Sequence, residues 1–212
     1  MNLFIYDCEI LKMIPQRNQP NDPKYQYCNG WTDYKGMRAS VLGAAIVEDD
    51  EVEYRSFVLD RMTSSTVDLD ELDIEFHAKH SPVVGFNSLN FDDKLMAAHG
   101  INIKTDYDLL DEVRLAAYGS TDYRECPKGR SYKLGKIGEA NGFPKTGNGE
   151  MAPKMWQDGR HQEVIDYCLN DVRIVYQLLK LGLAGQLVDP NTNGFLQLRA
   201  LPVKGECRTL MV

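Results

Sequence analysis

Runs of apolar residues alternate with polar turns along this chain, in a pattern that predicts an α/β protein. The first run, Leu3–Tyr6, is continuous, as expected for a strand buried on both faces, and two acids, Asp7 and Glu9, follow it. Two more runs, 40–48 and 52–59, flank the acidic turn EDDE and predict a β-hairpin. The chain is therefore expected to open with three strands.

Helical spacing begins after the hairpin. Leu69, Leu72 and Phe76 are spaced by three and four, which predicts an amphipathic helix over 68–79. The longest periodic segment, 161–183, predicts a second such helix. Between the two, the pattern predicts a short buried strand at VVGF, helices over 92–99 and 131–141, and a strand over 101–110.

Loops are indicated where Pro, Gly and polar residues gather. Residues 15–36 carry three Pro and two Gly and form most of an insertion over 11–36. Segments 119–131 and 142–158 are also predicted to be loops, and 184–205 an extended tail with a turn at DPNTNG.

This order of elements predicts a mixed sheet, because helices and strands alternate only after an antiparallel hairpin. We expect one domain over 1–183, with the insertion 11–36 inside it, followed by an extended C-terminal tail over 184–212.

The composition is that of an ordinary globular domain. Of 212 residues, 43% are apolar and 26% charged, so a single core can form without disulfides. No apolar run reaches 18 residues and no basic segment opens the chain, so we expect neither a membrane span nor a secretory signal. Five scattered cysteines without a CxxC pair indicate reduced thiols and a cytoplasmic protein.

The net charge narrows the possible partners. It is −7, from 24 basic and 31 acidic residues, so the chain does not bind duplex DNA by charge alone. Any contact with nucleic acid must be local, or assisted by metal ions at an acidic site.

Acids occupy the positions where such a site would form. Asp7 and Glu9, one residue apart at the end of a buried strand, share a face, and ligands of α/β sheets gather at such strand ends. Asp92 follows the VVGF strand and its turn. Asp171 lies four residues after Tyr167 on the long predicted helix, hence on the same helical face.

Each acidic pattern is weak when taken alone. Tyr-x-x-x-Asp occurs three times in the chain, and Asp-x-Glu recurs at Asp73 and Glu75. Of the Asp-x-Glu pairs, only Asp7 with Glu9 ends a buried strand. Of the Tyr-x-x-x-Asp pairs, only Tyr167 with Asp171 lies on a long apolar helix near the end of the chain. Carboxylates gathered in one place need a cation, and oxygen ligands favour Mg²⁺ or Mn²⁺. Two such ions are the apparatus of phosphodiester hydrolysis.

Three ordered segments, FIYDCEI, VVGFNSLNFDDKL and VIDYCLNDVRIVYQL, resemble the three exonuclease motifs of the DEDD superfamily of 3′-5′ exonucleases. Tyr167, and Asp166 in place of His five residues before Asp171, place the chain with the tyrosine subclass. The resemblance covers roughly 2–182 and is strongest to the proofreading domains of family B DNA polymerases and their stand-alone phage and bacterial relatives. It implies a ribonuclease H-like fold, a mixed five-stranded sheet flanked by helices.

The resemblance also implies roles for individual residues. Asp7 would bridge two metal ions, Mg²⁺ or Mn²⁺, with Glu9 and Asp171 on one ion and Asp92 supporting the other. Tyr167 would orient the attacking water, because a phenol is a poor base at neutral pH. Asn87 and Phe91 would lie beside the terminal nucleotide. The implied activity is metal-dependent release of nucleotides from the 3′ end of single-stranded DNA.

Other observations leave alternatives open. A ribonuclease acting on RNA 3′ ends and a non-catalytic module that binds nucleic acid or protein on the same fold remain rivals. Arg130 and Lys133 belong to a basic segment, 123–136, that could follow a phosphate backbone. The segment GNGEMA matches a dinucleotide-binding pattern but lacks the strand before it, so we reject that function.

Two further expectations concern single residues. Trp31 is expected to anchor its loop, and His77 and His80 are expected at the surface. Because four carboxylates repel one another without a cation, we also expect Asp171→Asn to stabilise the metal-free protein.

Overall fold

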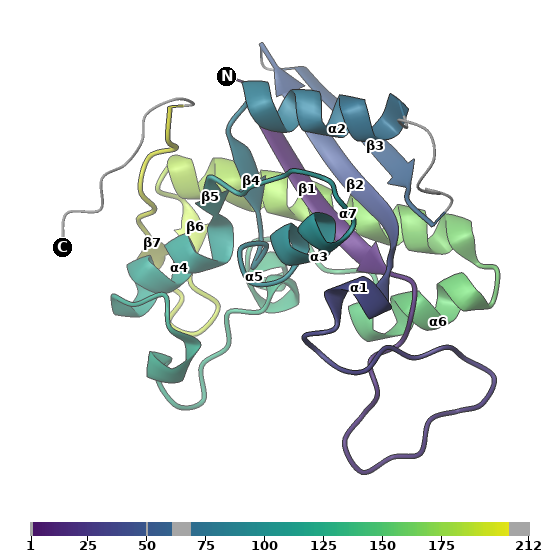
Figure 1. Cartoon of the computed structure of the whole chain (residues 1–212). Coiled ribbons are helices and arrows are strands. Elements are labelled where there is room, and N and C mark those ends of the chain that lie inside the picture. Colours follow the sequence, from purple (N-terminus) through teal and green to yellow (C-terminus); the bar gives the residue numbers. More distant parts are fainter. Residues whose placement is uncertain (1, 50, 61–68, 204–212) are drawn as a thin grey trace.

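The structure is a computed structural model that describes residues 2–49, 51–60 and 69–203. Its sheet has the order β3-β2-β1-β4-β5 (Figure 1). The strands β1, β2 and β3 pair antiparallel, whereas β1–β4 and β4–β5 pair parallel. The bounds are β1 (Leu3–Ile10), β2 (Ala39–Glu48), β3 (Glu51–Val58), β4 (Val83–Gly85) and β5 (Tyr107–Asp108). This mixed five-stranded sheet flanked by helices confirms the predicted fold class.

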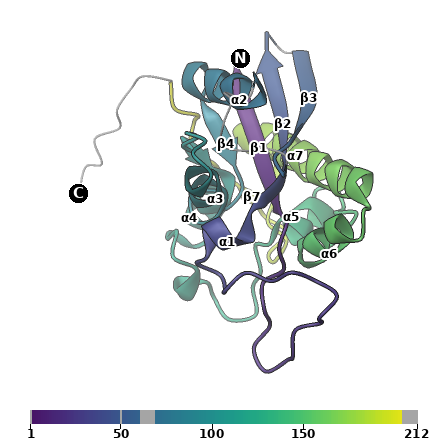
Figure 2. The same ribbon diagram turned by 45° about the vertical axis from the view of Figure 1, so that its right-hand side comes forward.

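Helices cover both faces of the sheet, as the turned view shows (Figure 2). In chain order they are α1 (Tyr34–Met37), α2 (Leu69–His80), α3 (Asp92–Ala98), α4 (Leu109–Tyr118), the 3₁₀ turn η1 (Tyr123–Glu125), α5 (Leu134–Ala140), the 3₁₀ turn η2 (Gly149–Met151), α6 (Ala152–Gln157) and α7 (His161–Leu183). The α7 helix has the bounds that the apolar period predicts.

The side chains of β1 alternate between two cores. Phe4 and Tyr6 pack on the side of α2 and α3, with Ile74 and Leu95. Leu3 and Ile5 pack on the other side, where α4, α5 and α7 lie. Because side chains alternate strictly along a strand, Asp7 and Glu9 belong to the side of α7.

The α2 helix forms where predicted but buries a different face. Ile74 and Ala78 are buried, whereas Leu72 and Phe76 are exposed. His77 is buried and its ring stacks on Phe4, so the expectation of a surface histidine is wrong at this position. The ring of Phe4 therefore packs against the ring of His77 on α2 and not against a leucine.

The segment 101–110 differs from the prediction. Only Tyr107–Asp108 forms a strand, and α4 begins at Leu109. Asp108 is the N-cap of α4 and accepts a hydrogen bond from the backbone N–H of Leu110 at 3.0 Å. Asp108 separates the apolar residues Tyr107, Leu109 and Leu110, and this cap divides them between a strand and a helix.

Each segment that was predicted to be coil contains some regular structure. The loop predicted over 15–36 runs into α1, and the loop predicted over 119–131 includes η1. The loop predicted over 142–158 includes η2 and α6. The tail predicted over 184–205 contains a small hairpin, β6 (Leu187–Val188) with β7 (Phe195–Leu196). Leu187 and Leu196 are buried against the α7 core, and Arg199 is ion-paired with Glu112 of α4. The described part of this segment therefore packs on the domain.

Within the described residues, no helix is both long and apolar enough to cross a membrane. Cys8, Cys28, Cys126 and Cys168 are free thiols, as predicted, and Cys207 lies outside the described ranges.

Candidate active site

The acids of β1 meet α7 at one end of the sheet. Asp7 and Glu9 follow Leu3 and Ile5 on the face that α7 covers, and Cys168 of that helix lies against them. One ligand atom from each of Asp7, Glu9 and Cys168 lies within 4.8 Å of the others. The Cys168 thiol contacts the backbone oxygen of Asp7 at 3.4 Å, which holds strand and helix together.

Asp92 approaches the same place from the other side of β1. Its Oδ1 accepts a hydrogen bond from the backbone N–H of Cys8 at 3.2 Å. This N–H is available because β4 pairs with β1 only at Phe4 and Ile5 and then turns away. The start of α3 therefore fixes Asp92 directly beside the acids of β1.

Tyr167 and Asp171 lie one turn apart on α7, and both are buried. A loop of two glycines encloses the tyrosine. A Cβ atom on Gly147 would lie 2.8 Å from Cδ2 of Tyr167, and one on Gly149 would lie 3.3 Å from its hydroxyl. The GNG sequence thus allows the loop to pack directly on the Tyr167 ring, which gives a steric reason for the motif rejected as a dinucleotide site.

These side chains line a cleft of about 780 Å³. We call the four acids and Tyr167 its floor, the lining residues Phe86, Asn87 and Phe91 one wall, and the lining residues of the insertion, 13–17 and Trp31, the other wall. The lining residues include Asp7, Glu9, Asp92, Tyr167, Asp171, Asn87, Phe91, Arg17, Trp31 and Lys145.

Lys145 is the residue of this site that the sequence analysis did not place there. Its Nζ lies 2.6 Å from Oδ2 of Asp171 and 5.0 Å from the centre of the Tyr167 ring. The carboxylate of Asp171 is 4% exposed and the lysine side chain 25%. Nothing in the loop around Lys145 has a period that would predict the direction of its side chain.

The cluster contains more negative charge than its surroundings neutralise. Burial raises the pKa of Asp7 well above its usual value, and the charges of Asp92 and Asp171 add to this. Burial, followed by the charges of Asp7 and Asp171, has the same effect on the pKa of Glu9. Lys145 opposes both shifts, since its positive charge favours the ionised acids.

Burial is also the largest cause of the raised pKa values of Asp92, Asp171 and Tyr167. Burial raises the pKa of Asp92 to about 7, although the hydrogen bond from Cys8 acts against the shift. Burial also raises the pKa of Asp171, with Lys145 opposing it. Burial, then the charges of Asp171 and Glu9, raise the pKa of the Tyr167 hydroxyl, which is therefore protonated at neutral pH.

The donors present fit a hard divalent cation. Oδ1 of Asp171 and the hydroxyl oxygen of Tyr167 are buried and have no hydrogen-bond partner among the described residues. Buried polar atoms without a partner are costly, so their presence beside other carboxylates fits the binding of a cation. The carboxylate oxygens of Asp7, Glu9, Asp92 and Asp171 suit Mg²⁺ or Mn²⁺.

Asn87 and Phe91 line the cleft. Asn87 adopts a left-handed backbone with φ of 65°, a conformation that asparagine tolerates. Its N–H donates to Oδ1 of Asp108 at 2.8 Å, which closes the turn. Phe91 packs edge-on against Tyr34 of α1. The loop thus joins the two walls behind the cleft.

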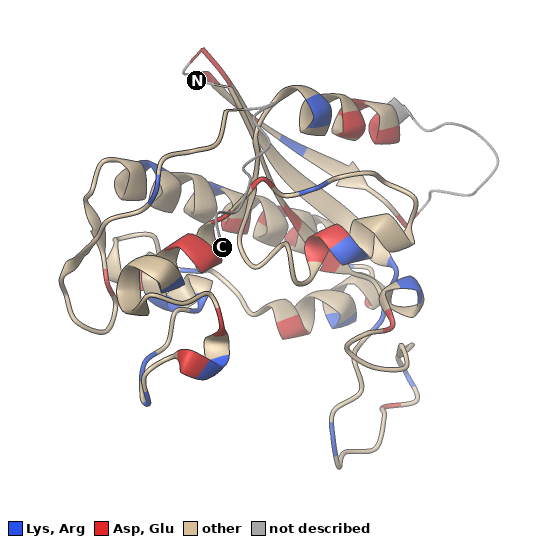
Figure 3. Ribbon diagram, turned by 60° about the vertical axis from the view of Figure 1, so that its left-hand side comes forward, with Lys and Arg blue, Asp and Glu red and all other residues tan. Residues whose placement is uncertain are grey.

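Arg130 and Lys133 lie outside the cleft. Lys133 lines a smaller hollow beside it, which shares Lys145 and Gly149 with the cleft, and Arg130 lines neither. Basic residues occur both on the insertion loop and around η1, without forming one broad stripe (Figure 3). The structure thus brings the four acids, Tyr167, Asn87 and Phe91 together and leaves the two basic residues aside.

Trp31 is not the anchor that we expected. It is 66% exposed and lines the cleft. Trp156, by contrast, is buried, donates to Oδ2 of Asp60 at 3.1 Å and stacks on His161. The sequence carries no local signal that distinguishes these two loop tryptophans.

Comparison with known proteins shows a likeness of fold. No family model and no curated protein matches the chain. Among solved structures, the family B DNA polymerase from the hyperthermophilic archaeon Pyrobaculum calidifontis is similar, with a TM-score of 0.54 and 16% sequence identity. The match covers 85% of this chain and 24% of the polymerase chain, so this chain corresponds to about a quarter of that protein. The likeness shows that the two chains share this fold.

Proposed function

We propose that the chain is a metal-dependent 3′-5′ exonuclease of the DEDD superfamily, tyrosine subclass, acting on the 3′ end of single-stranded DNA. One observation carries the proposal. Asp7, Glu9, Asp92 and Asp171, from three separate parts of the sequence, meet in one cleft beside the buried, unpartnered hydroxyl of Tyr167. Acids with raised pKa values are costly in a structural core, and such clusters mark functional sites.

Each of these residues would have a role that follows from its position in the cleft. Asp7, Glu9 and Asp171 would hold one Mg²⁺ or Mn²⁺ ion, and Asp7 with Asp92 a second. When bound, the two ions would acidify the attacking water and neutralise charge on the phosphate. Tyr167 remains protonated and would orient that water through its hydroxyl, because its raised pKa makes it unsuitable as a base. The buried carboxylates are preorganised, so little reorganisation is needed during the reaction.

The test is a gel assay with 5′-labelled single-stranded oligonucleotides of DNA and RNA, in Mn²⁺ or in EDTA. We expect a ladder of shortened DNA that depends on Mn²⁺ and disappears in Asp7→Ala and Asp171→Ala. Asp166→Ala is the matched control, because Asp166 is an exposed acid on the same helix. Activity that persists in Asp7→Ala contradicts the mechanism. Cleavage of RNA alone supports the exoribonuclease, and binding without cleavage supports the non-catalytic module.

A further inference from the structure

The insertion 11–36 presents an indole to the cleft. Of the exposed large apolar side chains in the described residues, Trp31 is the aromatic one on the wall of the cleft that holds the acids. Leaving most of an indole in water forgoes the stabilisation that burial gives to so large an apolar side chain. An exposed aromatic side chain on the wall of a polar cleft is therefore a candidate for ligand contact.

The backbone around Trp31 is held by one acid. Oδ2 of Asp33 accepts hydrogen bonds from the backbone N–H and the side-chain amide of Asn29, at 2.8 and 2.9 Å. Oδ1 accepts from the N–H of Gly36 at 3.0 Å, and the N–H of Asp33 donates to the oxygen of Gly30 at 3.1 Å. Trp31 lies inside this closed turn, so its position is fixed without burial of its ring.

The insertion is also attached to the domain. Gln157 of α6 accepts from the N–H of Gln26 at 2.6 Å and donates to the oxygen of Leu11 at 3.0 Å. Lys24 is ion-paired with Asp158 at 2.6 Å. A wall that is already ordered binds a ligand without a large entropic cost of ordering itself.

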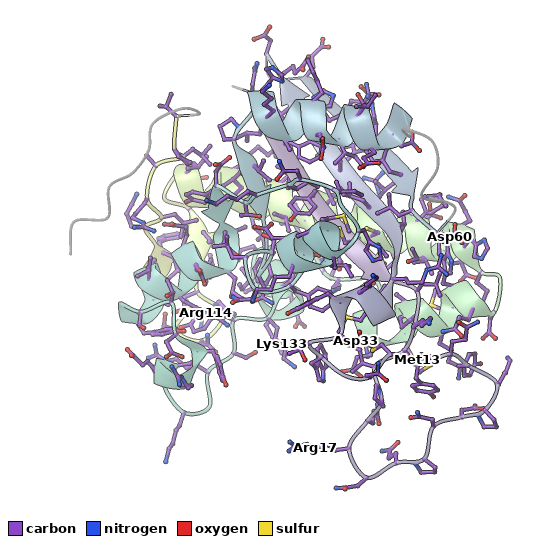
Figure 4. All side chains as sticks on the ribbon, viewed as in Figure 1. Met13, Arg17, Asp33, Asp60, Arg114 and Lys133 are labelled. Atoms are coloured by element: carbon purple, nitrogen blue, oxygen red, sulfur yellow. The ribbon has the colours of Figure 1, made fainter. Side chains whose placement is uncertain are left out.

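A positively charged side chain lies on the same wall of the cleft as the indole of Trp31. Arg17 lines the cleft, and its side chain extends away from the loop (Figure 4). In a chain of net charge −7, an arginine next to an acidic floor is placed to meet the phosphates of a strand that enters the site. Phe91 supplies an aromatic ring from the other wall.

We propose that Trp31 stacks on an unpaired base close to the 3′ end of the bound strand while Arg17 contacts its phosphate backbone, so that the insertion selects single-stranded ends. The proposal rests on the proposed function for the direction of the strand. Stacking on aromatic rings is tolerant of sequence, because every base has a flat face. Bases inside a duplex are stacked on both sides and a blunt end exposes one face of its last pair only, so an unpaired strand offers this contact far more readily.

Tryptophan fluorescence tests the contact directly. The chain has two tryptophans, one 66% and one 4% exposed. We expect single-stranded oligothymidylate, added with Ca²⁺ to prevent hydrolysis, to quench the wild-type signal, and a blunt duplex to quench it much less. In Trp31→Phe the quenching should disappear. Equal quenching by the strand in Trp31→Phe would overturn the proposal.

Kinetics provide the second measurement. We expect Trp31→Ala to raise KM for single-stranded DNA about tenfold, as for the loss of one stacked base, with a smaller change in kcat. Phe195→Ala is the matched control, because Phe195 is as exposed but lies on the β6–β7 hairpin. We expect Arg17→Ala to weaken binding and to reduce its dependence on salt. An unchanged KM in Trp31→Ala would overturn the proposal.

A small substrate separates the two proposals. The p-nitrophenyl ester of thymidine 5′-monophosphate has no strand for Trp31 to bind. If wild-type protein hydrolyses the ester but DNA does not quench Trp31, the stacking proposal fails and the nuclease stands. If DNA quenches Trp31 but neither substrate is hydrolysed, the nuclease fails and the strand-binding wall stands.

Discussion

The ammonium group of Lys145 lies 2.6 Å from the carboxylate of Asp171, and its positive charge opposes the raised pKa values of Asp7, Glu9 and Asp171. Lys145 and a metal ion would compete for the negative charge of the same carboxylate, although the lysine pairs with Oδ2 and leaves Oδ1 without a partner. Asp171 is therefore the acid of this cluster with its charge already compensated, and Glu9 is the more strongly destabilised one.

Lys145→Met should lower the melting temperature of the metal-free protein by about 2–4 °C, equivalent to about 1 kcal/mol, because the acids lose their neighbouring cation. Mn²⁺ should then stabilise the variant more than the wild type. The measurement is thermal unfolding in EDTA and in Mn²⁺. Lys136→Met is the control, because Lys136 carries the same charge on an exposed face of α5. A smaller response of Lys145→Met to Mn²⁺ would refute the competition.

Glu9→Gln should raise the melting temperature in EDTA, because it removes a buried charge whose pKa is raised by burial and by Asp7 and Asp171. The structure changes the sequence-based expectation for Asp171→Asn. Removing the Asp171 charge leaves Lys145 without its closest partner, so this variant should gain no stability. Unfolding of the two variants side by side decides the point, and a larger gain for Asp171→Asn would show that Lys145 does not compensate the cluster.

The stability of the metal-free protein should fall as the pH rises from about 5 to 7.5. The folded protein holds protons on Asp7, Glu9 and Asp92 that the unfolded chain has released above about pH 4. Stability from these groups is therefore complete below the unfolded pKa and is lost as the pH rises through the folded one, about 7 for Asp92. Melting temperatures in EDTA measure this slope. Asp92→Asn should flatten it near pH 7, and a slope unchanged by that substitution would contradict the assignment.

Gly147→Ala should lower kcat about tenfold or more, because the new Cβ would lie 2.8 Å from the Tyr167 ring and displace its hydroxyl. Tyr167→Phe should lower kcat at least as much, since it removes the hydroxyl that would orient the attacking water. Gly194→Ala, where a Cβ meets nothing closer than 3.5 Å, is the control. A normal kcat for Gly147→Ala would show that the loop does not position the tyrosine.

Local patterns explain why much of the fold could be predicted. The apolar run of β1, the alternation that turns Asp7 and Glu9 toward α7, and the period of α7 are all properties of short segments. They predict the sheet and the faces on which Tyr167 and Asp171 lie. The start of α4 also had a local signal, because Asp108 can cap a helix whose first turn contains Asp111 and Glu112. The apolar residues on both sides of Asp108 favoured a longer strand instead.

Other features depend on contacts that no local pattern encodes. Lys145 comes from a loop without a period, and its direction is set by Asp171 on a helix that follows later in the chain. Trp31 is exposed because it lies in a turn whose backbone is held by hydrogen bonds to Asp33 and not by packing of the indole against the core. Phe4 of β1 stacks on His77 of α2, so the side of the helix that carries His77 is buried and Phe76 is exposed. Each of these is a relation between distant segments.

The hydrogen bonds of the Gln157 side chain to Leu11 and Gln26 have a consequence for anyone who re-engineers this scaffold. They connect the insertion to α6, which leads through a three-residue link into α7 and hence to Tyr167. The insertion is therefore not an independent module. A transplanted or redesigned loop would need a matching residue at 157 and an acid at 158, and a library that varies 11–36 should vary these two positions with it.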